Sequence, residues 1–231
     1  MVDITSVQRR LIARGLDLGP SGADGVFGRK TLAAVMMLQA WSKLPQTGQL
    51  DAATLAALGL DGAAPLLPWI EEARRNLGLK EIAGPKHAPA IVRMLEALKA
   101  PFRDDETAWC GTFVGWCIST TLPKEPVPAA PWGSINWLKF GTKLDTPMYG
   151  CIAVFWRGSP DAWTGHVGFL VGQDSEAYHV LGGNQSDAVT ITRIAKGRVR
   201  PGGLRWPTTA GAPVLPLPLQ TLAGTLSRNE A

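Results

Sequence analysis

A cysteine at the expected start of a helix is the residue of this chain best suited to nucleophilic chemistry. Cys110 follows the polar stretch Asp104-Asp-Glu-Thr within a helical pattern over residues 107–120. Unpaired N–H groups and the positive end of the helix dipole stabilise a thiolate at such a position. Cysteine is also among the most buried residue types, and we interpret Cys117 and Cys151 in that way. All three should be free thiols, because Cys110 and Cys117 on one helix would be ~10 Å apart.

A histidine that could serve as the base lies at the start of an expected strand. His166 stands in Thr164-Gly-His-Val-Gly-Phe-Leu-Val171, where the flanking glycines allow close approach of other backbone. His87 at a solvated helix start and His179 in a partly buried strand are weaker candidates. Asn184 ends the next strand, and its amide could hold the imidazole in the correct tautomer. A turn asparagine that tolerates a positive φ is an equally good interpretation of that position.

The elements that must position these residues are helices in the first half of the chain and strands in the second. We expect helices near residues 4–12 and over 31–41, 54–58, 69–79, 87–98 and 107–120, and strands over 151–156, 166–171, 177–181 and 188–194. Asp51 is a plausible cap for the third helix. Helices followed by an antiparallel meander are typical of an α+β domain.

A change of composition marks a domain boundary. Asp61-Gly-Ala-Ala-Pro-Leu-Leu-Pro68 has the Pro/Gly/Ala character of an interdomain connection. We therefore expect a helical bundle over residues 1–60, a linker over 61–68 and an α+β domain over 69–207. Residues 208–231 have no sustained period and predict a loose, flexible tail. We find no internal repeats.

Charge and hydropathy exclude several classes of function. The net charge of +4 favours an acidic partner, but Lys and Arg are scattered, so we expect no nucleic-acid binding. The longest apolar stretches, such as 151–156, are far below the ~20 residues of a membrane span. Residues 1–30 lack the apolar segment of a signal peptide, so we expect the chain to stay in the cytosol where it is made.

Three motifs together resemble the CHAP and NlpC-type amidohydrolase/peptidase superfamily, over roughly residues 69–207. They are Trp-Cys-Gly-Thr-Phe-Val-Gly-Trp-Cys at 109–117, Gly-His-Val-Gly-Phe-Leu-Val-Gly at 165–172 and Leu-Gly-Gly-Asn-Gln-Ser at 181–186. The resemblance implies a papain-like core with Cys110 as nucleophile, His166 as general base and Asn184 as the orienting residue. It also implies hydrolysis of amide bonds in peptidoglycan through a thioester. The oxyanion hole would come from backbone N–H groups at the head of the cysteine helix.

The chain departs from this superfamily in one respect. Some members carry a calcium-binding aspartate ladder before the cysteine, whereas this chain has only Arg103-Asp-Asp-Glu106. The more economical interpretation is that those carboxylates favour the helix N-terminus. Because the histidines and cysteines also lack zinc-type spacing, we expect no metal and no cofactor.

The N-terminal segment has a resemblance of its own. Asp24-Gly-Val-Phe-Gly-Arg-Lys-Thr-Leu-Ala-Ala-Val, Leu38-Gln39 and Thr47-Gly-Gln-Leu-Asp-Ala-Ala-Thr54 are similar to the three-helix peptidoglycan-binding domain. The resemblance implies a shallow groove near residues 24–28, so Asp24, Gly25, Phe27 and Gly28 are candidate contacts, although Phe27 can equally be core.

Two tryptophans and the two family resemblances lead to a hypothesis for the function of the whole chain. Trp109 and Trp163 stand beside the proposed nucleophile and base, and we expect them to line the substrate cleft, since indoles often stack on sugars. The combination is that of a monomeric phage endolysin released by a holin-like protein, an amidase or a stem-peptide endopeptidase. A non-catalytic wall-binding phage component with the same fold is the main alternative.

Overall fold

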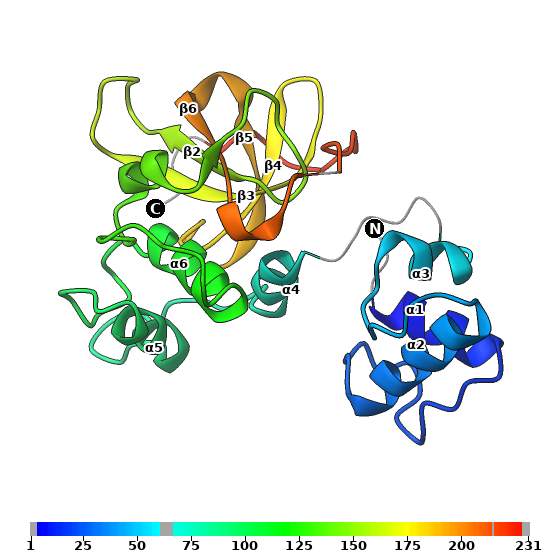
Figure 1. Ribbon diagram of the computed structural model, residues 1–231. Coiled ribbons are helices and arrows are strands. Elements are labelled where there is room, and N and C mark those ends of the chain that lie inside the picture. Colours follow the sequence, from blue (N-terminus) through cyan, green and yellow to red (C-terminus); the bar gives the residue numbers. More distant parts are fainter. Residues whose placement is uncertain (1–3, 61–66, 214, 228–231) are drawn as a thin grey trace. The chain divides into compact units, whose positions relative to one another are not determined.

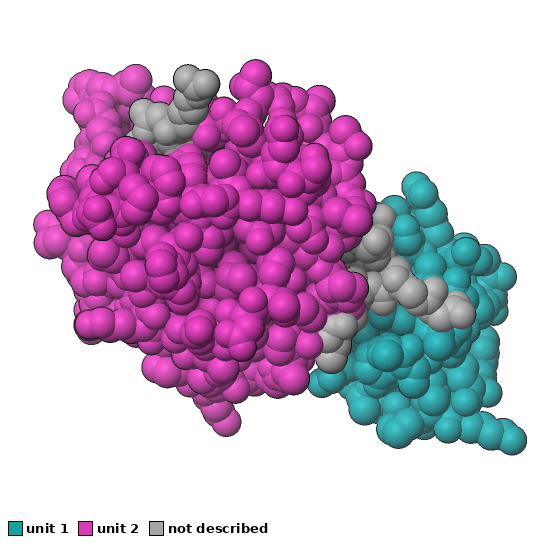
Figure 2. Space-filling view, turned by 90° about the horizontal axis from the view of Figure 1, so that it is seen from above, with its two compact units in different colours: residues 1–66 teal, residues 67–231 magenta. Residues whose placement is uncertain are grey.

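Two separate hydrophobic cores divide the chain. The computed structural model describes residues 4–60, 67–213 and 215–227, and these form two units, 1–66 and 67–231 (Figures 1 and 2). Most of the linker expected over 61–68 lies outside the described residues, except that α4 already begins at Pro68.

The first unit contains three helices, α1 Ile4–Ala13, α2 Arg29–Trp41 and α3 Ala52–Ala57. The helices and the chain directly after α1 and α3 supply a core of small and branched aliphatic side chains, Val7, Leu11, Leu16, Leu18, Ala34, Val35, Leu38, Leu55 and Leu58. The cap expected for the third helix is confirmed, because Asp51 Oδ1 accepts a hydrogen bond of 2.8 Å from Thr54 N.

A buried glutamine on α1 fixes the loop that leads into α2. Gln8 Nε2 donates to Val26 O at 3.0 Å and to Thr31 Oγ1 at 3.1 Å. Its Oε1 accepts from Gly25 N at 2.7 Å. One side chain therefore ties the loop, the following helix and α1 together, which satisfies buried polar groups that would otherwise be costly.

Gln39 on α2 repeats this arrangement at the loop that leads into α3. Its Nε2 donates to Gln49 O at 3.0 Å and Thr54 Oγ1 at 2.8 Å, and its Oε1 accepts from Gly48 N at 2.9 Å. The expectation of no internal repeat is thus wrong. Each loop and its helix share a glycine and Thr-Leu-Ala-Ala at the same spacing, in residues 24–35 and 47–58. A sequence match as short as this becomes evident only when Gln8 and Gln39 are compared, because each binds a glycine N–H, a backbone carbonyl and a threonine hydroxyl.

The second unit places helices on one side of an antiparallel sheet (Figure 1). The helices are α4 Pro68–Arg75, α5 Pro89–Ala97 and α6 Cys110–Thr121. The strands are β1 Thr142–Lys143, β2 Ile152–Trp156, β3 Gly165–Gln173, β4 Ala177–Gly182, β5 Thr190–Ala195 and β6 Val199–Trp206. Their order in the sheet is β1-β6-β2-β3-β4-β5. Short 3-10 helices lie at Ser134–Lys139, Lys196–Arg198 and Thr208–Ala210. The α+β class and the meander β3-β4-β5 are as expected.

Strand β6 was not predicted, although it lies in the middle of the sheet between β1 and β2. It contains Pro201-Gly202-Gly203, a sequence typical of a turn. The pairing of β6 with β2 is irregular between Ala153 and Phe155, and Gly202 has φ +70°. The strand therefore accommodates these residues in a bulge. Proline has no N–H to donate to a neighbouring strand, and within a bulge that hydrogen bond is not required.

The segment after residue 207 is not the loose tail that its composition predicted. Its described residues bind across the unit: Tyr149 N donates to Leu215 O, Gln173 N to Pro218 O and Ser227 N to Arg193 O, at 2.8 to 3.0 Å. The Leu217 side chain is buried in the main core. Irregular backbone of this kind gives no periodic pattern in the sequence, because its hydrogen bonds are made with residues that are distant in the chain.

No helix in the described ranges is long and apolar enough to cross a membrane.

Candidate active site

The cysteine helix begins with the cysteine itself. Cys110 is the first residue of α6, and Trp109 before it contributes no side-chain cap to the helix. A Cβ on Gly111 would lie 2.3 Å from Pro131 O and 2.7 Å from Trp132 O. Glycine is therefore required at position 111, because backbone of another segment lies directly against the first turn.

The environment of the Cys110 thiol contains opposing influences. Burial raises its pKa, while the backbone N–H groups of Val167 and Gly111 and the positive charge of Arg157 lower it. Burial prevails and the pKa is raised. The helix N-terminus was expected to stabilise a thiolate, but burial outweighs the N–H groups around Cys110, so a reaction at neutral pH would need a base to remove the proton. The thiol's hydrogen bond to Val167 N–H places it next to the residue that follows His166.

His166 is buried, and a glutamine determines its tautomer. Its Nε2 lies 3.0 Å from Gln185 Oε1. The amide nitrogen of Gln185 donates to Thr190 O at 2.7 Å and Val180 O at 3.2 Å, and carbonyl oxygens can only accept. Gln185 therefore presents its oxygen to the ring, His166 Nε2 carries the proton, and Nδ1 is the basic nitrogen.

Two glycines bring the imidazole and the cysteine helix to the same place. A Cβ on Gly182 would lie 3.1 Å from His166 Nε2, and a Cβ on Gly183 would lie 2.4 Å from the Trp109 ring and 2.7 Å from Phe113 Cβ. The last residue of β4 and the residue after it thus lie against His166 and the first turn of α6. Larger side chains at either position would separate the two.

Asn184 does not have the position that the sequence analysis assigned to it. Its Oδ1 accepts from Trp109 N at 3.0 Å, and its Nδ2 lies 3.3 Å from Glu81 Oε1, which also accepts from Trp109 Nε1 at 2.6 Å. Asn184 therefore secures the start of α6, and Gln185 is the residue at His166. The turn asparagine interpretation agrees with the structure in one respect, since Asn184 has φ +56°. With this backbone conformation, the side-chain amides of Asn184 and Gln185 point towards different partners, Trp109 and His166.

The acidic stretch before the cysteine has a structural role. Asp105 is buried and accepts from Ile82 N at 3.0 Å and Ala88 N at 2.8 Å, and lies 2.9 Å from His87 Nδ1. Burial alone would raise the pKa of Asp105, but these hydrogen bonds outweigh it and the pKa is lowered. The ionised carboxylate ties down the 82–88 loop instead of the head of α6, and His87 Nδ1 is one of its hydrogen-bond partners. Within the described ranges, no three His, Cys, Asp or Glu side chains cluster closely enough to hold a metal ion.

We expect EDTA to leave any hydrolytic activity nearly unchanged, because the carboxylates of residues 104–106 all accept hydrogen bonds from backbone N–H groups, and that of Asp105 also contacts His87. Turbidity loss of a peptidoglycan suspension with and without EDTA measures this. Loss of activity that added calcium restores would contradict it.

His179 serves the fold and not the candidate site. Its buried Nε2 lies 2.9 Å from Asp174 Oδ2, and its Nδ1 lies 3.3 Å from Gln220 Nε2 in the C-terminal segment. Asp174 also pairs with Arg193 at 2.8 Å. These contacts join β4 and β5 to the segment after β6.

The two tryptophans expected to line a cleft are placed differently. Trp109 is fully buried, packed edge-on against Phe113, so the expectation that it lines the cleft is wrong. Its indole is needed in the core, where it fixes the head of α6. Trp163 is 80% exposed on the β2–β3 connection, three residues before His166.

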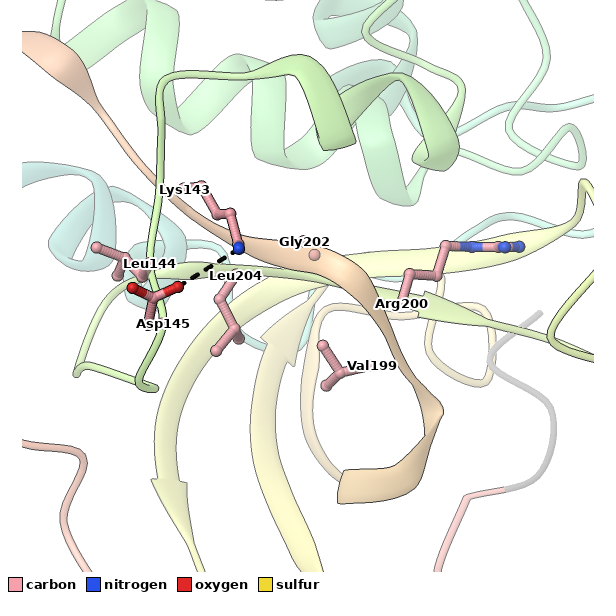
Figure 3. Close-up of a pocket in the computed structure, with 8 residues that line it drawn as sticks. Lys143, Leu144, Asp145, Val199, Arg200, Gly202 and Leu204 are labelled. Carbon is pink, nitrogen blue, oxygen red and sulfur yellow. Dashed lines mark ion pairs between the residues drawn. The ribbon is translucent and has the colours of Figure 1, made fainter.

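A pocket of about 220 Å³ lies elsewhere in this unit, lined by residues 143–145 at the end of β1 and by residues of β6 (Figure 3). Its lining includes an exposed ion pair between Lys143 and Asp145 at 3.4 Å, and neither Cys110 nor His166 contributes to it. It carries none of the chemistry of the candidate site.

In the first unit, the loop before α2 presents the residues proposed to contact the cell wall. The Asp24 carboxylate accepts from Gln8 Nε2 at 2.8 Å and Val26 N at 2.9 Å, and hydrogen bonding from Gln8 is the main reason for its lowered pKa. Gly25 has φ +78°, and Gly28 precedes the first residue of α2. Phe27 is exposed and not part of the core. Asp24 thus shapes the loop, whereas Phe27 is available at its surface.

Comparison with known families identifies this unit. Residues 2–58 match the family model of a putative peptidoglycan binding domain. No curated protein and no solved structure matches the chain. The match supports the resemblance seen in residues 24–54 and indicates peptidoglycan as the partner of the peptidoglycan-binding domain.

Within the peptidoglycan-binding domain, Phe27→Ala is expected to weaken binding to insoluble peptidoglycan roughly tenfold, as for an exposed aromatic contact. Pelleting of the full chain in a Cys110→Ala background measures binding without digestion. Ile12→Ala is the matched control, because Ile12 is a similarly exposed apolar residue on α1. Equal losses in both variants, or none in Phe27→Ala, would show that this loop is not the contact surface.

Proposed function

We propose that this protein is a cysteine-dependent hydrolase that cuts amide bonds in bacterial peptidoglycan. The observation that carries the proposal is the placement of the Cys110 thiol against the N–H of Val167, the residue that follows His166, together with the hydrogen bond between His166 Nε2 and Gln185. Thiol-dependent acyl transfer requires a nucleophile, a base and a group that orients the base, and Cys110, His166 and Gln185 could supply them. The peptidoglycan-binding domain supplies the substrate class.

The proposed reaction follows from the protonation states. His166 Nδ1 accepts the thiol proton as Cys110 Sγ attacks the amide carbonyl. N–H groups at the start of α6 stabilise the oxyanion, which the uncapped first turn permits. The imidazolium then protonates the departing amine, and a thioester remains. Water, deprotonated by His166, hydrolyses the thioester and returns the enzyme to its thiol form.

The raised pKa of Cys110 gives His166 a necessary part in this scheme. A buried thiol that stays protonated at neutral pH reacts poorly until a base removes its proton. Gln185 keeps that base in one tautomer, with Nδ1 available to accept. The resting protein is thereby protected from adventitious oxidation at Cys110, which is only 5% exposed.

We favour the bond between the lactyl group of muramic acid and L-alanine. Cleavage between sugars would use two carboxylates around the glycosidic oxygen, whereas a thiol and an imidazole suit acyl transfer. Trp163 supports the amidase because an exposed indole so close in sequence to His166 offers a flat surface for a sugar. A stem-peptide endopeptidase is the alternative within the same chemistry. In either case we propose the biological role of an endolysin, in keeping with a wall-binding domain joined to a hydrolytic one.

Digestion of purified peptidoglycan followed by mass analysis tests the proposal. Free stem peptides that begin with L-alanine would support the amidase, and new amino termini on later stem residues would support the endopeptidase. Reducing sugar ends would contradict both. Absence of cleavage, with retained binding to the wall, would favour a non-catalytic wall-binding protein.

A further inference from the structure

The β2–β3 connection, residues 157–164, is held rigidly beside the candidate site. Arg200 is 8% exposed, and its guanidinium donates to Pro160 O and Thr164 O, both at 3.0 Å, and to Ala162 O. The Arg200 side chain therefore holds three carbonyl groups of the connection at once. A recognition loop benefits from such rigidity, because less conformational entropy is lost when a ligand binds.

Strand register places Arg157, the first residue of this connection, on the same side of the sheet as His166. His166 is the partner of Phe155 across β2 and β3, and Arg157 N donates to Thr164 O at 3.2 Å. Residues directly opposite each other share a face, as do alternate residues along a strand. Arg157 is thus the diagonal neighbour of His166, at a separation of about 7–8 Å that a long side chain can bridge.

The charge of Arg157 also acts on the nucleophile. Burial raises the pKa of Cys110, and among the influences that lower it is the positive charge of Arg157. Because Arg157 is half-buried, its guanidinium is not fully screened by solvent. One cation therefore neighbours both the nucleophile and the base.

We propose that Arg157 binds a free carboxylate of the substrate beside the scissile amide, which makes the enzyme selective for acidic stem peptides. This inference rests on the proposed hydrolase function and names the substrate chemistry of the same site. A planar guanidinium recognises a carboxylate through paired hydrogen bonds, whereas a carboxamide lacks the charge and one acceptor. In peptidoglycan the carboxylate can come from the glutamate or from the diaminopimelate of the stem peptide.

A binding experiment tests this without requiring turnover. Full-length Cys110→Ala protein is titrated by calorimetry with three synthetic muramoyl peptides, one with both carboxylates free, one amidated at glutamate and one amidated at diaminopimelate. We expect one of the amidated peptides to bind roughly 10- to 100-fold more weakly than the free acid, the range of a charge-assisted hydrogen bond. That peptide identifies which carboxylate Arg157 recognises.

Substitutions at Arg157 then assign the discrimination to this residue. In the same background, Arg157→Gln should reduce the preference for the free acid to within about twofold, and Arg157→Lys should keep part of it. Arg75→Gln is the control for the change in charge, since Arg75 is a 72% exposed arginine whose ion pair is with Glu72 of its own helix. Thermal denaturation checks that all variants are folded.

Kinetics of the Cys110-containing enzyme separate recognition from thiol activation. Removing a cation near Cys110 should lower kcat for acid and amide peptides alike, whereas loss of recognition changes the ratio of their KM values. Retained discrimination in folded Arg157→Gln, or equal binding of all three peptides by the parent, would overturn the inference. Failure of the parent enzyme to cut any peptide, with discrimination in binding intact, would instead reject the hydrolase proposal alone.

Discussion

Replacement of Cys110 by alanine is expected to reduce peptidoglycan cleavage by roughly a factor of 10⁴ or more, as removal of a covalent nucleophile does. Neither of the other two thiols should replace it, because Cys117 and Cys151 are fully buried and burial raises their pKa values, that of Cys151 to about 12. Dye-labelled peptidoglycan release and circular dichroism measure activity and fold together.

Cys117→Ala provides the matched control for this experiment. Cys117 lies on the same helix and is fully buried, so its truncation costs some stability through lost packing but should leave activity largely intact. If the folded Cys110 variant kept most of its activity, the assignment of nucleophile, base and orienting residue would fail together.

Truncation of Gln185 to alanine is expected to lower kcat by roughly 10²-fold or more, since the loss of an orienting partner leaves the imidazole free to adopt the wrong tautomer. The structure predicts this sensitivity at Gln185, whose Oε1 lies 3.0 Å from His166 Nε2. Initial rates across pH 5 to about 9 on a soluble muramoyl peptide measure it. Substrate affinity, measured by KM, should change little.

The Asn184→Ala variant distinguishes the loss of the Gln185–His166 contact from a general disturbance of the turn that contains both amides. Asn184 binds Trp109 N, so its truncation should loosen the start of α6 and lower the melting temperature, with a smaller fall in kcat. A folded Asn184→Ala variant that loses more activity than Gln185→Ala would restore Asn184 to the role that the sequence analysis gave it.

The sequence predicted which elements meet at the candidate site better than which side chains bind one another there. Cys110 and His166 were selected from residue type and their places at the starts of a helix and a strand, and the structure brings these elements together. The exchange between Asn184 and Gln185 could not be foreseen, because one positive φ decides which of two adjacent amides faces the ring. The glycines before them are informative in retrospect, since each marks a close approach to His166 or to α6.

The remaining differences have a common physical cause. The Trp109 indole has a polar N–H and an otherwise apolar ring, so it could either line a cleft or lie in the core. Its position beside Cys110 in the sequence did not reveal that Glu81 binds the N–H and that Phe113 packs against the ring. Strand β6 and the segment after residue 207 are held by partners that are distant in sequence. The local periodicity of hydrophobic residues predicts helices and strands that bury one regular face. It predicts nothing where tertiary contacts override the secondary-structure propensity of the residues.

The path of the C-terminal segment has a practical consequence for domain grafting. If the second unit is to be joined to a different anchoring domain, the end of the last strand, Trp206, is the obvious place to cut. A chain cut there would lose the carbonyl groups of Leu215 and Pro218, which accept from Tyr149 and Gln173, and would leave the site of Leu217 empty. A transplantable unit therefore has to run from about residue 67 through Ser227, and a fusion partner is best attached beyond that residue.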